Sequence, residues 1–488
     1  MANLKHPSDP DPDPEPAAAR RLMSRRETIA GAAKLVAGLG IGAQVMAATG
    51  ADDAMARQVR HVARRAGKSG YGPLVNHTGE MSLPEGFHYV HFGDAFTPMS
   101  DGFLTPPCHD GTTVFPAGRG VVRMIRNHEG YGQGKTRGGS FHAYDRVARG
   151  GVTSSLFDTD KGELIESGIV LNGTHENCNG GHTPWGSWLS CEENTEGPTQ
   201  GFEKPHGYVF EVPHDARRAV EPVPIKAMGR MEHEAAAIDP RSGIVYLTED
   251  NGDPADGFYR YLPDDTRRLH KGGVLQMLAV EGHSRYDTTH GQTVGRKLHC
   301  EWVTIDDVDP PEAETEPAAV WRQGRAKGAA QFIGVEGCHW AKGSVYFVAS
   351  EGGDAEEGQI WRYTPHGHEH GTLVLLYEST SEKVLDEPDT ITVSPRGGVL
   401  ICEDGNGEDE AGGDNYLRIL SPAGELETFA RNDTPLDLHR WEENKPGVIG
   451  RSEWSGSTYS PDGRWLFVHI QYPGRTFAIT GPWEKGWG

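Results

Sequence analysis

The sequence lacks the short motifs that define several common enzyme and metal-binding classes. Its six cysteines, at positions 108, 178, 191, 300, 338 and 402, show no C-x-x-C spacing, which argues against a zinc ribbon or a thioredoxin motif. No G-x-S-x-G occurs, so a serine nucleophile elbow is not supported. The run from Gly130 to Thr136 resembles a phosphate-binding loop, but Glu129 stands where that motif needs its first glycine.

Basic residues are also in short supply. Lys and Arg together number 47 against 70 Asp and Glu, which leaves a net charge of -23. This balance argues against nucleic acids and anionic membrane surfaces as partners. It suits cation binding, although scattered surface carboxylates also serve solubility.

Long hydrophobic runs are missing as well. The most apolar stretch, Ala30 to Ala48, is rich in Gly and Ala and is interrupted by Lys34, so it is a poor membrane span. It follows Arg25 and Arg26, as in a twin-arginine export signal, although Thr28 stands where Phe is usual. An uncleaved anchor or an ordinary soluble N-terminus are the alternatives. We expect a disordered N-terminus with this signal region at 1–50, a basic connector at 51–72, and one domain at 73–488.

Glycine and proline are plentiful. The chain holds 65 Gly and 32 Pro, with short Val, Ile, Tyr, Trp and Phe runs between them, which favours an all-β protein. A unit of paired strands recurs, as in Gly243 to Pro263 and Gly343 to Pro365. In each copy an apolar strand ends at an acidic residue, and an aromatic strand follows. Six copies predict a six-bladed β-propeller with inserted loops and a short helix.

The spacing inside the repeat indicates a metal cluster. Four pairs of residues lie fifteen positions apart and carry an acid or a thiol at both ends: Cys178 and Glu193, Glu234 and Glu249, Glu336 and Glu351, Asp389 and Asp404. In an antiparallel hairpin the start of one strand lies beside the end of the next, so every blade would present such a pair at the same rim. These rims meet at the mouth of the central channel, where crowded carboxylates are costly unless cations bind. The alternative is acidic turns that point into water. Glu453 and His469 hold similar places in the last unit, and His469 is either a ligand or a packed polar residue.

A segment at about 264–331 interrupts the repeat. It contains two strand-like runs, Gly273 to Val280 and Leu298 to Ile305, and a predicted helix from Ala318 to Gln331. Arg322, Arg325 and Lys327 on this helix belong either to a solvated face or to an anion-binding edge over the channel.

Several motifs together resemble the PhoX family of bacterial alkaline phosphatases, over about Glu80 to Trp483. They are Arg126-Asn-His-Glu129, Asn177 to Glu193, Gly358-Gln-Ile-Trp-Arg-Tyr, Pro388-Asp389, and Ser460-Pro-Asp-Gly to Thr480-Gly-Pro-Trp483. The resemblance implies a six-bladed propeller, export by the twin-arginine machinery to the periplasm or medium, and hydrolysis of phosphomonoesters at an iron and calcium cluster. It implies that Cys178 and Glu193 are iron ligands, with Glu234 a third. It makes Glu249, Glu336, Asp389, Glu403 and Asp404 calcium candidates.

One departure from the family bears on substrate recognition. The family pattern F-x-R-x-E-G carries an Arg suited to phosphate, whereas Gly334 stands at that place here. The sequence therefore predicts an exported, metal-dependent phosphomonoester hydrolase with no nucleic-acid partner and no stable membrane insertion. The alternatives are a propeller hydrolase for a lactone or a phosphotriester, or a non-catalytic propeller stabilised by calcium.

Overall fold

The computed structural model describes residues 70–76, 79–139, 141–252, 254–405, 415–434, 436–437, 449–450 and 452–488. The predicted signal region and nearly all of the connector lie outside these residues. The described chain is mostly antiparallel sheet with little helix, which confirms the all-β prediction. The strands are β1 (Leu74–Asn76), β2 (Met81–Pro84), β3 (His88–Phe92), β4 (His109–Gly118), β5 (Val121–His128), β6 (Gly150–Asp158), β7 (Glu163–Thr174), β8 (Asn177–His182), β9 (Ser187–Glu192), β10 (Val209–Pro213), β11 (His233–Ile238), β12 (Val245–Glu249), β13 (Phe258–Pro263), β14 (Gly273–Val280), β15 (Lys297–Thr304), β16 (Cys338–Ala341), β17 (Ser344–Ala349), β18 (Gln359–His366), β19 (His370–Glu378), β20 (Pro388–Val393), β21 (Val399–Glu403), β22 (Tyr416–Leu420), β23 (Leu426–Asn432), β24 (Leu436–Asp437), β25 (Ile449–Gly450), β26 (Trp454–Tyr459), β27 (Trp465–Ile470) and β28 (Arg475–Thr480). The described residues form one α-helix, α3 (Ala319–Ala326).

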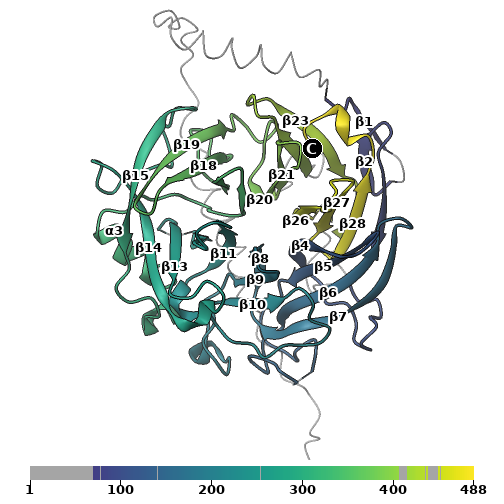
Figure 1. The fold of residues 1–488 in the computed structure, drawn as a ribbon, viewed down its shortest axis with the longest axis horizontal. Helices are drawn as coiled ribbons and strands as arrows, with labels where there is room; N and C mark the ends of the chain where they lie inside the picture. The colour runs from purple at the N-terminus through teal and green to yellow at the C-terminus, as the bar shows by residue number, and fades with distance from the viewer. Residues whose placement is uncertain are drawn as a thin grey trace, which may run out of the picture.

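The sheets follow one another around a common centre, as Figure 1 shows. Within the described residues, four units consist of four strands consecutive in the chain: β4–β7, β11–β14, β16–β19 and β20–β23. The remaining strands depart from this pattern. Strands β8–β10 form a three-stranded sheet, while β26–β28 take β3 from the N-terminal side as their fourth strand.

The prediction of six blades is therefore not confirmed, and the described residues form a propeller-like arrangement with four complete units. Strand β15 pairs with both β14 and β19 and joins two of the units into a nine-stranded sheet. Strands β1 and β2 extend the sheet of β20–β23, and β24 pairs only with β25. Sequence periodicity cannot reveal such edge pairings, because they join strands far apart in the chain.

The first strand of each group lies nearest the centre. Strands β4, β8, β11, β16, β20 and β26 contact one another in this order, and β26 contacts β4, which closes a ring. Glycine permits the close approach of β8 and β11, because a Cβ at Gly181 would lie 1.9 Å from the carbonyl oxygen of Ala236. The ring brings the starts of these strands together, although they are spread over more than three hundred positions.

The apolar core lies between neighbouring units rather than at the centre of the ring. Phe258 of β13 stacks on Phe347 of β17 with ring centroids 4.5 Å apart, and both rings are fully buried. Trp361 and Tyr363 belong to the same cluster. Burial of such aromatic surface is the main stabilising term for stacked sheets. The centre of the ring is thereby left to polar and ionisable side chains.

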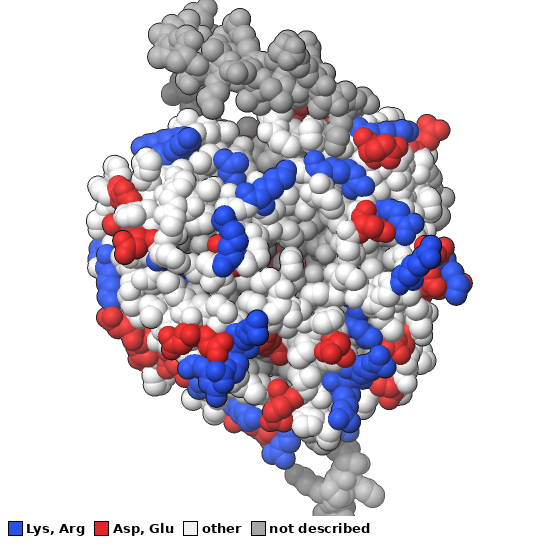
Figure 2. Space-filling model, viewed as in Figure 1, with Lys and Arg blue, Asp and Glu red and all other residues white. Residues whose placement is uncertain are grey.

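All six cysteines are free thiols and buried, so no disulfide joins them. No helix in the described part of the chain has the length and apolarity needed to cross a membrane. On the face in Figure 2, acidic and basic side chains are intermixed around the periphery, and the middle of the face shows few charges.

Candidate metal centre

Ionisable side chains gather where the inner strands begin. Asp110, Cys178, Glu234 and Asp389 are each the second residue of β4, β8, β11 and β20, and Glu336 lies two residues before β16. A second set follows the neighbouring strand directly: Glu129 after β5, Glu193 after β9 and Asp250 after β12. In the hairpins β4–β5, β8–β9 and β11–β12, each of the two strands thus brings one candidate ligand to this place, whereas β16–β17 and β20–β21 bring a candidate from the first strand only.

A bulge recurs at the start of these inner strands. The pairing register shifts between Asn177 and Gly180 in β8, so Cys178 falls within the irregular stretch. Equivalent shifts enclose Asp110 in β4, Glu234 in β11 and Asp389 in β20. A bulge bends its strand and re-aims a side chain. The same local irregularity, used four times, therefore turns these side chains to one place.

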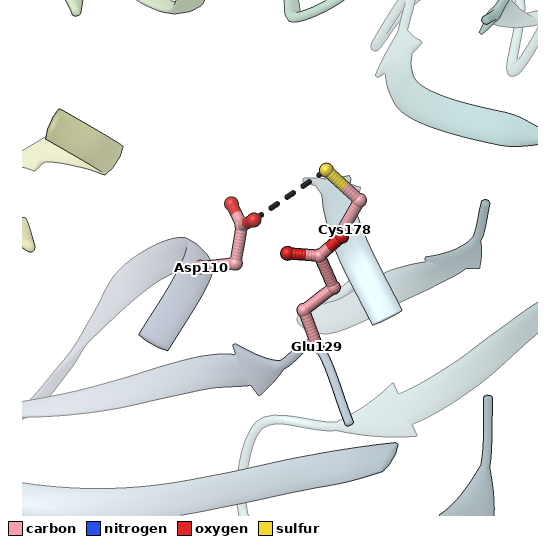
Figure 3. A group of neighbouring side chains, drawn as sticks. All are labelled: Asp110, Glu129 and Cys178. Carbon is pink, nitrogen blue, oxygen red and sulfur yellow. Dashed lines mark hydrogen bonds between the residues drawn. The ribbon is translucent and has the colours of Figure 1, made fainter. Parts of the chain in front are cut away.

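Four groups of potential ligand atoms result, and within each group the atoms lie within 4.8 Å of one another. The shared members Cys178, Glu193, Glu234 and Glu336 link the groups into one continuous cluster. Figure 3 shows the carboxylate of Glu129 turned toward the space between Asp110 and Cys178, where the Cys178 thiol donates a 3.4 Å hydrogen bond to Oδ2 of Asp110. The groups are Asp110 with Glu129 and Cys178; Cys178 with Glu193 and Glu234; Glu193 with Asp250 and Glu336; and Glu234 with Glu336 and Asp389.

Burial and mutual repulsion raise the proton affinity of this cluster. Burial, followed by the charges of Glu193 and Asp389, raises the pKa of Glu234 well above its usual value. Burial raises the pKa of Asp110 to about 7, opposed in part by hydrogen bonds that include the one from Cys178. Burial and the neighbouring carboxylates likewise raise the pKa of the Cys178 thiol. Such carboxylates stay ionised in this setting only with cations beside them.

The buried oxygen atoms provide the direct test of whether a metal fits. Both carboxylate oxygens of Glu234 are fully buried, and neither has a hydrogen-bond partner within the described chain. Oδ1 of Asp110 is also buried without a hydrogen-bond partner in the described chain. Burial of an ionised carboxylate that has no partner costs on the order of several kcal/mol. Carboxylate oxygens around one thiolate match the ligands of iron and calcium, so the residues fit these cations.

The structure brings together five of the eight residues nominated from sequence. These are Cys178, Glu193, Glu234, Glu336 and Asp389. The other three, Glu249, Glu403 and Asp404, lie outside the four groups.

These three residues have other surroundings than the members of the four groups. Glu249 is buried and accepts a 2.5 Å hydrogen bond from the hydroxyl of Tyr259. Glu403 accepts a 2.6 Å hydrogen bond from Nε of Arg418 and a 2.9 Å bond from the amide of Tyr416. Asp404 is exposed. Both buried residues thus accept hydrogen bonds from the protein, although Oε1 of Glu249 is buried without a partner in the described part of the chain.

Sequence reasoning missed three members of the cluster, namely Asp110, Glu129 and Asp250. Asp110 and Glu129 are nineteen positions apart rather than fifteen, because β4 and β5 are longer than the hairpins that set the pattern. Asp250 follows Glu249, and the amide of Asp250 donates to the carbonyl of Glu232 at 3.1 Å. These acids could have been recognised by their positions rather than by their spacing. Each one lies at the start of an inner strand or directly after the strand that pairs with an inner strand.

Gly334 leaves no room for a side chain. Its φ of +58° is in the left-handed region, and a Cβ there would lie 2.1 Å from Oγ of Ser350. Its amide donates a 2.5 Å hydrogen bond to Asp256, and its carbonyl accepts a 2.6 Å bond from the amide of Ser350. Ser350 in turn donates to Glu336 at 3.0 Å. Gly334 therefore supports a cluster residue through its backbone and offers no cation to a substrate.

The other residues left open by sequence have local roles. Arg322 on α3 pairs with Glu316, and Lys327, which directly follows α3, pairs with Asp306 at 2.6 Å, so both cations are engaged at the surface. Nδ1 of His469 lies 2.9 Å from the hydroxyl of Thr476, and His469 belongs to none of the four groups. This geometry fits the interpretation of His469 as a packed polar residue.

Comparison with solved structures places the fold. The chain aligns with Pseudomonas fluorescens PhoX in complex with vanadate, a transition state analogue, at a TM-score of 0.62 and 18% identity over 86% of this chain and 99% of that chain. A gluconolactonase from Xanthomonas campestris aligns at a TM-score of 0.38 and 12% identity over 85% of this chain and 98% of that chain. No curated protein sequence matches the chain.

Comparison with family models covers the region that carries the cluster. The model of alkaline phosphatase PhoX matches residues 153–474. This range includes Cys178, Glu193, Glu234 and Asp389, and it is about two thirds of the chain. The chain therefore belongs to the PhoX alkaline phosphatase family, whose members are phosphoric ester hydrolases.

Proposed function

We propose that this protein hydrolyses phosphomonoesters at a cluster of iron and calcium ions held by the four side-chain groups. The observation that carries the proposal is Glu234, whose two buried oxygens have no donor in the described part of the chain, while carboxylates of the neighbouring groups lie close to it. Clustered cations supply charge neutralisation for a phosphate dianion and a nucleophilic oxygen at neutral pH.

The chain's own residues divide into two kinds of ligand. Cys178 is the one soft ligand among hard carboxylates, so we assign iron to the groups that contain it, with Asp110, Glu129, Glu193 and Glu234. Asp250, Glu336 and Asp389 offer only carboxylate oxygens, which suit calcium. Ser350 orients Glu336 through its 3.0 Å hydrogen bond.

The experiment joins metal analysis to an assay on one sample. Protein purified after native export is analysed for iron and calcium, then assayed with p-nitrophenyl phosphate, a lactone and a p-nitrophenyl phosphotriester. We expect both metals and turnover of the monoester alone. Turnover of the lactone or the triester instead would replace the proposal with a different propeller hydrolase. A protein that holds calcium, lacks iron and turns over none of the three would be the non-catalytic alternative.

The absence of a side chain at Gly334 favours a changed mode of substrate recognition rather than loss of the metal site. The cluster residues are present, whereas the position that carries an Arg in the resembling family is sterically closed here. A phosphate group therefore needs other cationic contacts in this protein.

Two finer features are also proposals. We infer that the sheets β8–β10 and β26–β28 with β3 complete a six-bladed propeller, supported by the closed ring of inner strands. An experimental structure that places either sheet outside this ring would refute the count. Export by the twin-arginine route is supported by Arg25 and Arg26. Replacing both with Lys is expected to retain the protein in the cytoplasm, and unchanged export would exclude that route.

A further inference from the structure

The glycine-rich run that begins at Gly130 directly follows the cluster residue Glu129. It runs against the segment that leads into β6, because the amide of Gly134 donates to the carbonyl of Val147 at 2.8 Å. A Cβ at Gly130 would lie 2.3 Å from the carbonyl carbon of Arg149. The backbone of Arg149 is therefore packed against the residue next to Glu129.

The same run fixes the backbone around Arg137. The hydroxyl of Thr136 donates to the carbonyl of Gly139 at 2.5 Å. The side chain of Asn172 on β7 accepts from the amide of Gly138 at 3.0 Å and donates to the carbonyl of Gly139 at 2.6 Å. The residues on both sides of Arg137 are thus held in place, which pre-organises its side chain.

Arg137 and Arg149 have no acidic partner in the part of the chain that the structure describes. Neither guanidinium makes an ion pair or a side-chain hydrogen bond there, and Nε of Arg137 is buried without a partner. Nearby Arg146 shows the usual arrangement, since its Nε and Nη2 donate to Glu203 at 2.8 and 2.5 Å. Two like charges held together without a counter-ion are costly, and in a chain with 70 acidic residues partners were available.

The two arginines line one small hollow together with Pro106, Gly151 and Asn172. Burial and then the charge of Arg149 lower the pKa of Arg137, as expected of two guanidinium groups at one hollow. Because the backbone of Arg149 packs against Gly130, the residue that follows Glu129, the pair lies on the Glu129 side of the metal cluster.

We propose that Arg137 and Arg149 form an oxyanion-binding site that holds the phosphate group of the substrate beside the metal cluster. Guanidinium groups bind phosphate through paired N–H donors and remain charged at all working pH values. The site supplies the cationic contact that Gly334 excludes. This inference rests on the proposed phosphatase function, because that function defines the ligand.

The test compares Arg137→Gln, Arg149→Gln and the double variant with Arg146→Gln, whose side chain is already paired with Glu203. Binding of inorganic phosphate to the metal-loaded protein is measured by calorimetry. The KM and kcat for p-nitrophenyl phosphate are measured on the same samples. We expect the double variant to raise the phosphate Kd and the KM at least tenfold while kcat changes less than about threefold. Arg146→Gln should match the wild type, and the Lys variants of both positions should retain part of the affinity.

Folding and function are separated by two further readouts. Melting temperatures without phosphate show whether the variants fold, and the rise in melting temperature on adding phosphate reports binding independently of turnover. If no sample hydrolyses the ester but the double variant still loses phosphate affinity, the inference stands and the proposed function fails. A phosphate Kd in the folded double variant equal to that of the wild type overturns the inference, whatever the activity.

Discussion

The Cys178 thiol lies 3.4 Å from Oδ2 of Asp110, although the two residues are 68 positions apart and belong to different sheets. Burial raises the pKa of both groups, so in the metal-free protein the pair holds protons that a cation would displace. Metal binding at this pair therefore releases protons and couples metal affinity to pH.

Cys178→Ser should remove iron while leaving the fold intact. A hydroxyl matches the volume of the thiol but is a poor ligand for iron, so we expect iron content near zero and activity reduced by at least about 100-fold. Calcium content should change little. Elemental analysis and the phosphatase assay measure both. Cys300→Ser is the matched control, since Cys300 is a buried cysteine on β15 outside the four groups. Normal iron content in Cys178→Ser would remove this residue from the site.

Glu234→Gln should have opposite effects on the metal-free and metal-loaded proteins. Because burial raises the pKa of Glu234 well above its usual value, folding without metal requires this group to take up a proton at neutral pH, a cost that Gln does not carry. We therefore expect the metal-free protein to gain about 1–3 kcal/mol in the free energy of unfolding. The loaded protein should lose stability and activity because a ligand is lost. Denaturant titrations with and without chelator measure the two effects. Destabilisation of the metal-free form would show that the carboxylate has a structural partner instead.

His206, which contacts Glu192 beside the cluster residue Glu193, makes stability depend on pH. Burial alone would lower its pKa, but the charges of Glu192 and Asp145, with Oε1 of Glu192 2.7 Å from Nδ1, raise the pKa to about 9. Because the folded-state pKa exceeds the unfolded value of about 6.5, this stabilisation is complete below pH 6.5 and is lost as pH rises to 9. We expect a loss of about 3 kcal/mol over this range.

The His206→Gln variant isolates that effect. Its free energy of unfolding should be lower than that of the wild type at pH 6, and the difference should shrink toward pH 9. Denaturant titrations at fixed metal saturation measure it. A difference that stays constant between pH 6 and 9 would exclude a charged His206.

Gly334→Ala should destabilise the protein, and the cause can be isolated with a second variant. The new Cβ meets Oγ of Ser350 at 2.1 Å, and the left-handed backbone is unfavourable for Ala, so we expect a loss of about 1–3 kcal/mol. In a Ser350→Gly background part of this loss should disappear, because the clash is gone while the backbone strain remains. Equal losses in both backgrounds would mean that Ser350 does not limit this position. Gly334→Arg should likewise restore no phosphate affinity.

Glu403→Gln tests the structural role that its contacts indicate. Its carboxylate accepts a 2.6 Å bond from Arg418, and both side chains are at least nine-tenths buried. Loss of that charge leaves a buried Arg without its counter-ion, so we expect destabilisation of about 3 kcal/mol and unchanged iron and calcium. Calcium lost in proportion to the substitution would make Glu403 a ligand after all.

The sequence alone determined the strand-rich fold and the principle of the site. Gly and Pro punctuation marked the strands, and acids or a thiol at both ends of a hairpin predicted that paired strands would present ligands at one rim. Cys178, Glu193, Glu234, Glu336 and Asp389 were found in this way because their hairpins share one length. Glycine at position 334 was visible too, as a departure from the resembling family.

Only the tertiary structure decided which of two adjacent acids at a strand end belongs to the cluster. Successive side chains at a strand end point to opposite sides, so a shift of one residue exchanges Glu249 for Asp250. That shift depends on bulges and hairpin lengths, which composition and spacing do not encode. The pairing of Cys178 with Asp110 depends on closure of the inner ring, and the meeting of Arg137 with Arg149 depends on a loop packed against a strand start. Both are contacts between segments whose separation in the chain carries no periodic signal.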